Sequence, residues 1–265
     1  MHAKRWLIGL LLLVLLLAGR TIFLNFQGRS GLAEIQRRGA LRVGLDASFP
    51  PFEMLAENGQ VVGLDADIAR AIAADLGVEV EFVNLGFDGL YDALQAERVD
   101  VIISGLPVDP YRTEEVAYSI NYFNAGQALV TTDPEIQSLN DLAGRTVAVE
   151  WGSMADMEAR RLRQTLPDLQ LNPQPDPQAA LQFETAIVDG VTALSNPERR
   201  LVAYLSDDWY AAAVSVENRA LLAAINQTLT RLIETGEMKR LQENWFTVQS
   251  SGFRVQSSEF RVQSF

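Results

Sequence analysis

The first half of the chain alternates short β-branched runs with helical segments. The expected strands cover residues 41–45, 78–83 and 101–103. Residues 63–77, between the first two strands, carry apolar side chains at helical spacing, and a shorter helix is expected from about residue 87 to residue 96. This strand–helix order predicts a parallel sheet with helices on its faces, which is an α/β fold.

The third strand ends at Ser104 and Gly105, just before a Pro-Val-Asp-Pro turn. Open α/β sheets bind ligands beyond the carboxyl ends of their strands. Arg112 follows this turn, and a guanidinium placed there suits a carboxylate, which it binds through two parallel hydrogen bonds. The alternative is a surface ion pair between Arg112 and Glu114 or Glu115, and spacing alone does not choose between the two.

Composition excludes several kinds of site. The net charge of −12 argues against a nucleic-acid partner, because phosphate binding needs a basic surface. The chain has no cysteine, which rules out thiol catalysis, disulfides and thiolate metal sites. Its one histidine, His2, belongs to the leader, so the remaining chain has no imidazole. We therefore expect neither a cofactor nor a metal.

Residues 1–27 form the leader. Lys4 and Arg5 precede an apolar run from Trp6 to Gly19, which has the length of a signal peptide and is short for a spanning helix of about 20 residues. The run ends like a lipoprotein signal, but Arg20 stands where a lipidated cysteine would be. No clear cleavage site follows, so an uncleaved anchor in the cytoplasmic membrane is the alternative. Either way we expect a periplasmic or extracellular protein that meets the membrane only through this segment.

The second half repeats the strand–helix pattern. Residues 171–178 are expected to form a proline-rich loop. Residues 248–265 contain a seven-residue repeat without coiled-coil spacing and are expected to form a disordered tail. The turn 151–155 precedes a helix, and the free N–H groups at such a helix start suit an anionic group. The remaining expected elements are strands at 124–131, 146–150 and 186–188 and helices at 156–166, 217–235 and 238–246.

Seven segments between about residues 32 and 246 resemble the extracellular solute-binding proteins of family 3, the polar-amino-acid receptors of ABC importers. They fall in the order that the family shows, and together they are far more specific than any one alone. The segments are LAEIQRRGALRVGLDASFPPFE, ENGQVVGLDADIARAIAADLG, FDGLYDALQAERVDVIISGL, the turn from Pro110 to Arg112, SLNDLAGRTVAVEWGS, AIVDGVTAL and LQENWF.

The resemblance implies a type 2 periplasmic-binding fold: two Rossmann-like lobes of mixed, mostly parallel sheet, joined by a two-strand hinge. Lobe 1 would comprise residues 32–126 and 213–247, and lobe 2 residues 127–212. Such a protein is not an enzyme. It would capture a small amino acid, polar or basic, by hinge closure and deliver it to an ABC transporter permease, and we expect it to be a monomer.

The resemblance also assigns roles in binding the ligand carboxylate. Arg112 would clamp the α-carboxylate, while the backbone N–H of Gly105 and the turn at Ser153 and Met154 would support the same group. Ser104 is counted with them as a ligand-binding residue, although it could be only a small residue at a strand end.

Four further residues would hold the rest of the ligand. Asp189 matches the acid that receives the α-ammonium, Phe49 and Phe87 match the aromatic residues around the side chain, and Asp46 matches an acid that addresses a polar or cationic tip. Alternatives remain open: the two acids could be helix N-caps, and the two rings could be plain core. A zwitterionic ligand does need an Arg and a carboxylate within an apolar slot.

The chain departs from the family in three places. Pro107 stands where the family usually has Ser or Thr, so a hydroxyl and an N–H are lost. The helix before Asp189 and the return from Asp189 to Trp209 both look shortened. Two other functions stay open, a dehydratase of the prephenate/arogenate type using Glu150 or Asp88 as its acid, and a membrane-anchored amino-acid sensor.

Overall fold

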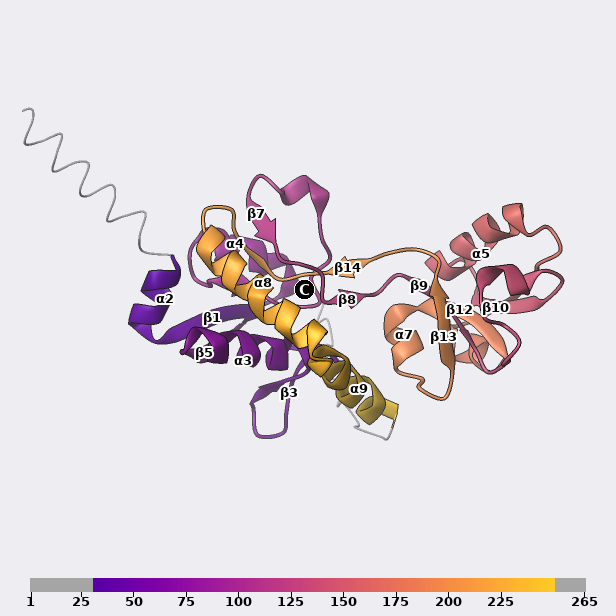
Figure 1. Ribbon diagram of the computed structural model, residues 1–265, viewed down its shortest axis with the longest axis horizontal. Coiled ribbons are helices and arrows are strands. Elements are labelled where there is room, and N and C mark those ends of the chain that lie inside the picture. Colours follow the sequence, from indigo (N-terminus) through magenta and orange to yellow (C-terminus); the bar gives the residue numbers. More distant parts are fainter. Residues whose placement is uncertain (1–30, 251–265) are drawn as a thin grey trace, which may run out of the picture. The chain divides into compact units, whose positions relative to one another are not determined.

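The computed structural model describes residues 31–250, with side chains as far as residue 246 (Figure 1). The described chain forms two compact units. The first contains residues 31–120 and 211–234, and the second contains residues 121–210 and 235–250. The first lobe expected from the sequence includes residues 213–247, whereas residues 235–250 belong to the second unit.

The first unit is built on a five-stranded sheet with the order β5-β1-β6-β15-β7. β1 pairs in parallel with both β5 and β6, and β15 runs antiparallel to β6 and β7. The parallel arrangement predicted for the first half of the chain is confirmed. The strands are β1 (Ala40–Leu45), β5 (Glu79–Asn84), β6 (Val101–Ile102), β7 (Val116–Tyr118) and β15 (Ala213–Ser215).

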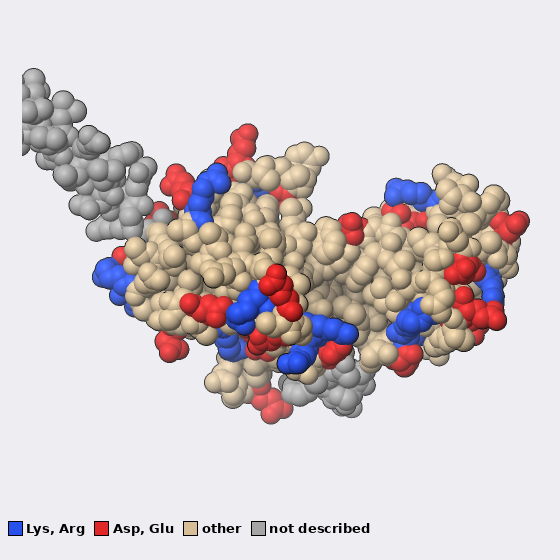
Figure 2. Space-filling view, viewed as in Figure 1, with Lys and Arg blue, Asp and Glu red and all other residues tan. Residues whose placement is uncertain are grey.

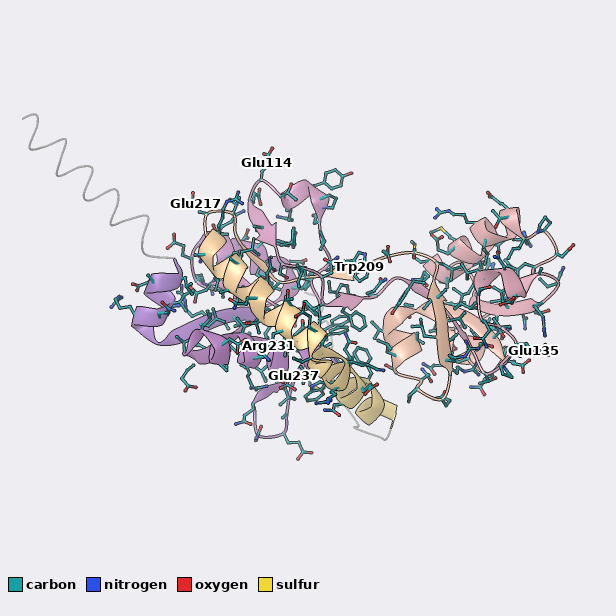
Figure 3. All side chains as sticks on the ribbon, viewed as in Figure 1. Glu114, Glu135, Trp209, Glu217, Arg231 and Glu237 are labelled. Atoms are coloured by element: carbon teal, nitrogen blue, oxygen red, sulfur yellow. The ribbon has the colours of Figure 1, made fainter. Side chains whose placement is uncertain are left out.

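Helices cover this sheet because their apolar stripes are buried against it. α3 buries Ile68 and Ile72, and α4 buries Leu90 and Leu94 beside Ile102 of the sheet. α3 packs against α8 (Figure 1), and Arg231 of α8 (Figure 3) forms an ion pair with Asp75 of α3. The helices of this unit are α2 (Leu32–Arg38), α3 (Leu64–Leu76), η1 (Phe87–Gly89), α4 (Leu90–Gln95), η2 (Pro110–Arg112) and α8 (Arg219–Glu234).

A small antiparallel sheet of β2 (Ser48–Phe49), β3 (Glu53–Leu55) and β4 (Val61–Val62) connects β1 to α3. Gly63 joins β4 to α3 at φ 132°, and a Cβ there would lie 2.1 Å from the carbonyl oxygen of Phe52. Only glycine allows this backbone conformation and this close approach. The start of α3 is therefore held tightly against β3.

The second unit has its own five-stranded sheet, with the order β11-β10-β12-β9-β13. β10 is parallel to β11 and β12, whereas β9 is antiparallel to β12 and β13. β8 and β14 form a separate antiparallel pair. The strands are β8 (Phe123–Asn124), β9 (Gln127–Thr131), β10 (Thr146–Glu150), β11 (Gln170–Gln174), β12 (Thr185–Asp189), β13 (Arg200–Tyr204) and β14 (Trp209–Tyr210).

Both faces of this second sheet are buried. Leu129 and Val149 belong to one cluster, while their neighbours Val130 and Ala148 belong to another. Alternation of this kind is expected for an α/β sheet with packing on both sides. The helices of this unit are η3 (Leu139–Leu142), α5 (Met154–Thr165), α6 (Pro177–Ala180), α7 (Gly190–Leu194) and α9 (Glu237–Ser250).

The loop expected over residues 171–178 is wrong. β11 covers its first four residues, with Pro173 opposite Val149 of β10, and α6 begins at Pro177 after an Asp176 N-cap. β11 is the edge strand of its sheet, where the N–H that proline lacks is not needed by a neighbour. Proline also suits the first position of a helix.

The return from Asp189 to Trp209 contains α7 and β13, which sequence analysis did not recognise. The strand expected over residues 124–131 is divided into β8 and β9. The Oδ1 atom of Asn124 accepts hydrogen bonds from the N–H groups of Gly126 and Asp208, and these bonds hold the break between the two strands.

α9 continues to Ser250, so the first three residues of the expected tail are helical. The leader and residues 251–265 lie outside the described residues, and the predictions for them stay predictions. Between residues 31 and 250, no helix combines the length and the apolar character needed to cross a membrane. Acidic and basic side chains are interspersed on the face that Figure 2 shows.

Candidate functional site

Asp46 lies directly after β1, and its carboxylate binds the segment that follows β1 and the segment that follows β5. Its Oδ1 atom accepts a hydrogen bond of 2.7 Å from the Ser48 hydroxyl, and its Oδ2 atom accepts one of 3.0 Å from the Phe87 N–H. The carboxylate therefore holds the first residue of η1 beside the end of β1. Each oxygen retains a second lone pair for a further donor.

Phe49 lies on β2 and Phe87 at the start of η1. They are 40% and 42% exposed. Phe49 is stacked on the buried Phe52, with ring centroids 5.2 Å apart and planes at 9°. The alternative that these two rings are plain core is wrong, because each presents a large part of its surface outside the core.

Ser104 and Gly105 follow β6, and their polar groups are engaged with protein atoms. The Ser104 hydroxyl accepts a hydrogen bond of 3.0 Å from the Asp46 N–H and donates one of 2.6 Å to Glu53. The Gly105 N–H donates to Asp65. The expected contact between Gly105 and a ligand carboxylate stays a prediction, because this N–H has an internal acceptor here.

Arg112 ends η2 and is 42% exposed at its side chain. Its guanidinium carbon lies 4.2 Å from the centroid of the Tyr91 ring, a cation–π arrangement. Its nitrogens lie 3.5 Å from Asp109 and 3.5 Å from Glu115, which are long distances for ion pairs. The alternative of a surface ion pair is therefore present with Glu115, at a long distance. The Tyr91 ring fixes the plane of the Arg112 guanidinium.

Tyr91 is itself held in place. Its hydroxyl forms a hydrogen bond of 2.9 Å with the hydroxyl of Tyr118 on β7. Burial is the main reason that the pKa of Tyr91 is raised, and the bond to Tyr118 adds to it. The ring under Arg112 is therefore a neutral and rigid support.

In the second unit, Ser153 is the N-cap of α5 and Met154 its first residue. The Ser153 hydroxyl donates to the Glu150 carbonyl at 2.8 Å and accepts the Asp156 N–H at 3.2 Å. The Asp156 carboxylate accepts the Gly152 N–H at 3.1 Å, so an anion of the chain already uses part of this helix start. The Met154 side chain is 54% exposed.

Asp189 ends β12 and is the N-cap of α7. The alternative prediction, that this acid caps a helix, is confirmed. Its two oxygens accept the Thr192 N–H at 2.9 Å and the Thr192 hydroxyl at 2.6 Å. A carboxylate offers about four acceptor positions, so capping leaves room for another donor. The structure places Asp189, Ser153 and Met154 in the second unit and the other six expected residues in the first.

Two acids that the sequence did not predict as part of the site lie behind the end of β6: Glu53 on β3 and Asp65 on α3. Both side chains are fully buried. Burial, followed by the neighbouring charge of Asp65, raises the pKa of Glu53 to about 10. One signal existed: Asp65 lies three residues before Ile68 on the buried stripe of α3, where an acid is unusual.

Residues 31–246 hold no group of three or more acidic, histidine or cysteine side chains placed to bind a metal ion.

Known proteins are similar to this chain in sequence and in fold. The family model for bacterial extracellular solute-binding proteins, family 3, matches residues 41–248. The arginine-binding extracellular protein ArtP of Bacillus subtilis is 30% identical over 264 residues, covering 92% of this chain and 98% of ArtP.

Solved structures agree with this assignment. A mutant of ArgBP from T. maritima is 37% identical, covers 81% of this chain and 98% of its own, and superimposes with a TM-score of 0.52. An ancestral cyclohexadienyl dehydratase, AncCDT-3, is 28% identical, covers 81% and 95%, and has a TM-score of 0.70. The expected type 2 periplasmic-binding fold is confirmed, and the chain belongs to the bacterial extracellular solute-binding proteins of family 3.

Proposed function

We propose that this protein captures a polar or basic amino acid, with arginine as the first candidate, and delivers it to the permease of an ABC importer. Membership of the family supports the binding role. The name of ArtP states arginine binding, and this supports a cationic ligand. The protein would act outside the cytoplasm. The leader would either be cleaved as a signal peptide or remain as a membrane anchor.

The observation that carries the proposal is the joint placement of Asp46 and Phe87. The Asp46 carboxylate binds the Phe87 N–H directly, so an acid and a half-exposed ring belong to one fixed group. Phe49, also half-exposed, follows Asp46 by three residues. Aromatic faces beside a carboxylate suit the flat, charged end of an arginine side chain, because the rings attract cations and the acid neutralises them.

The α-carboxylate and α-ammonium of the ligand would be bound by Arg112 and Asp189. Arg112 presents a guanidinium that is held flat on Tyr91 and only loosely paired, so it has N–H donors to offer. Asp189 has acceptor capacity beyond its capping bonds. Closure of the two lobes on the ligand is part of the proposal, and small-angle scattering with and without ligand tests it.

A thermal-shift screen against the twenty amino acids, followed by calorimetry, tests the proposal. At one hundred times the dissociation constant, a ligand stabilises the folded protein by about 2.7 kcal/mol. For a protein of this size we expect a rise in Tm of about 5–10 °C. Arg112→Ala and Asp189→Ala should abolish the shift, whereas Arg37→Ala, on an exposed surface pair, should not. A flat response to the whole panel would refute the proposal.

One observation favours a second function, a dehydratase. The ancestral cyclohexadienyl dehydratase superimposes with a TM-score of 0.70. An enzyme of this type needs an acid that transfers a proton to a leaving hydroxyl, and Asp88 in η1 and Glu150 at the end of β10 are the candidates. A change in the ultraviolet spectrum after mixing with prephenate would establish this activity, because the loss of water and carbon dioxide makes the ring aromatic. An unchanged spectrum would exclude prephenate as a substrate.

A further inference from the structure

Two buried carboxyl groups lie behind the strand end that carries Ser104 and Gly105. Glu53 on β3 and Asp65 at the start of α3 come from separate elements, and both side chains have no exposed surface. None of the roles assigned above uses either group. Acids are rarely buried unless they are paired, so this location needs an explanation.

Hydrogen bonds connect both acids to the expected binding residues. The Asp46 N–H donates to the Ser104 hydroxyl at 3.0 Å, and that hydroxyl donates to Glu53 Oε1 at 2.6 Å. The Gly105 N–H donates to Asp65 Oδ2. One acid therefore orients the serine side chain and the other orients the glycine backbone.

The second oxygen of Glu53, Oε2, is buried, and no N–H or O–H group of the described chain is directed at it. The charged groups that act on Glu53 are Asp65 and Asp46, which are both acids. α3 also carries Asp67 and Arg70, but these pair with each other at 2.9 Å. Two adjacent buried carboxylates cannot both remain ionised at low cost, because burial removes the solvation of their charges and the charges repel each other.

We propose that Glu53 keeps its proton at neutral pH and donates it from Oε2 to the Asp65 carboxylate, and that this acid pair positions Asp46, Ser104 and Gly105 for ligand binding. Every donor in the group then has an acceptor: the Ser104 hydroxyl points to Glu53 Oε1, Glu53 Oε2–H to Asp65, and the Gly105 N–H to Asp65. A hydrogen bond to Asp65 is among the causes that raise the pKa of Glu53.

The pKa of Glu53 is higher in the folded than in the unfolded protein, so folding retains a proton that the unfolded chain releases. The stabilisation is complete below the unfolded pKa and declines as pH rises toward the folded pKa. Above that value the two carboxylates would repel each other and release the strand end.

A first experiment needs no ligand. The infrared spectrum of the full chain at pH 7 should contain the C=O stretch of a protonated carboxylic acid, which Glu53→Gln removes and the exposed-residue control Glu57→Gln keeps. Glu53→Gln should also flatten the alkaline fall in Tm, because an amide donates to Asp65 and accepts from Ser104 without titrating. An identical carboxylic band in wild type and Glu53→Gln would overturn the assignment of the proton.

A second experiment tests the positioning role, which rests on the proposed amino-acid binding. Calorimetry with arginine at pH 7 should show affinity about tenfold weaker in Glu53→Ala, with most of the loss restored in Glu53→Gln. Between pH 7 and 10, wild-type affinity should fall more steeply than that of Glu53→Gln, because loss of the proton from the ligand α-ammonium weakens binding in both proteins alike. Equal affinities and pH profiles in all three proteins would refute the positioning role. If wild type binds no amino acid, the proposed function fails, and the infrared result still decides the proton.

Discussion

Replacing Asp100 by Asn should destabilise the first unit strongly. The Asp100 side chain is 1% exposed and forms ion pairs with Arg38 of α2 and Arg42 of β1. It also accepts the Arg42 backbone N–H at 2.8 Å. The hydrogen bond to Asp100 is the main reason that the pKa of Arg42 is raised. This one carboxylate ties a helix end, a strand and the start of β6 together.

The magnitude follows from burial. Breaking a buried pair by removing one partner costs about 3–5 kcal/mol, because a charge is left without its counterion. Asn keeps one acceptor oxygen, and the side chains of Arg38 and Arg42 are 27% and 23% exposed, so water offsets part of the loss. We therefore expect a loss of about 2–4 kcal/mol. This corresponds to a fall in Tm of about 5–15 °C.

Asp75→Asn is the matched control. Asp75 accepts two hydrogen bonds from Arg231, at 3.1 and 2.9 Å, but both side chains are 41% exposed. Exposed pairs contribute less than about 1 kcal/mol because water and salt screen them. Denaturant unfolding followed by circular dichroism measures both variants. Equal losses in the two variants, or a loss below about 1 kcal/mol in Asp100→Asn, would refute the reasoning from burial.

Two further substitutions test other features. Pro107→Ser returns a hydroxyl and an N–H to the turn after β6. Amino-acid affinity measured by calorimetry should rise about tenfold. An unchanged affinity would contradict this prediction. Gly126→Ala would place a Cβ 1.9 Å from the Ser206 carbonyl oxygen, and we expect a loss of unfolding free energy of about 2–4 kcal/mol. Gly86→Ala has no atom within 4 Å of the new Cβ and should be nearly neutral.

The parallel part of the first sheet could be predicted from the sequence because its signal is local. β1, β5 and β6 are short runs that each contain valine, and the stripe of α3 has helical period, so strand and helix positions follow from spacing. β11 was missed because Pro173 within it and Pro175 just after it are typical of a loop. Only its place at the sheet edge permits a proline in this strand. Edge position is a tertiary property that no local pattern contains.

The candidate residues could be located but not their partners. Position after a strand predicted where Ser104 and Arg112 lie, whereas the acid behind Ser104 and the ring beneath Arg112 come from segments 51 and 21 residues away. Contacts over such separations depend on how β3, α4 and β6 pack together. Sequence spacing does not determine that packing.

Each unit is built from two separate stretches of the chain, and this affects when the unit can fold. β15 stands between β6 and β7 in the first sheet, so that sheet cannot be completed before residue 215 is available. In the second unit, Phe246 of α9 is stacked on Phe123 with ring centroids 5.3 Å apart, which needs residues almost at the end of the described chain. During synthesis neither unit can reach its native packing until the final part of the chain has emerged from the ribosome. A polypeptide that stays incompletely folded for that long remains suited to passage through a narrow translocation channel.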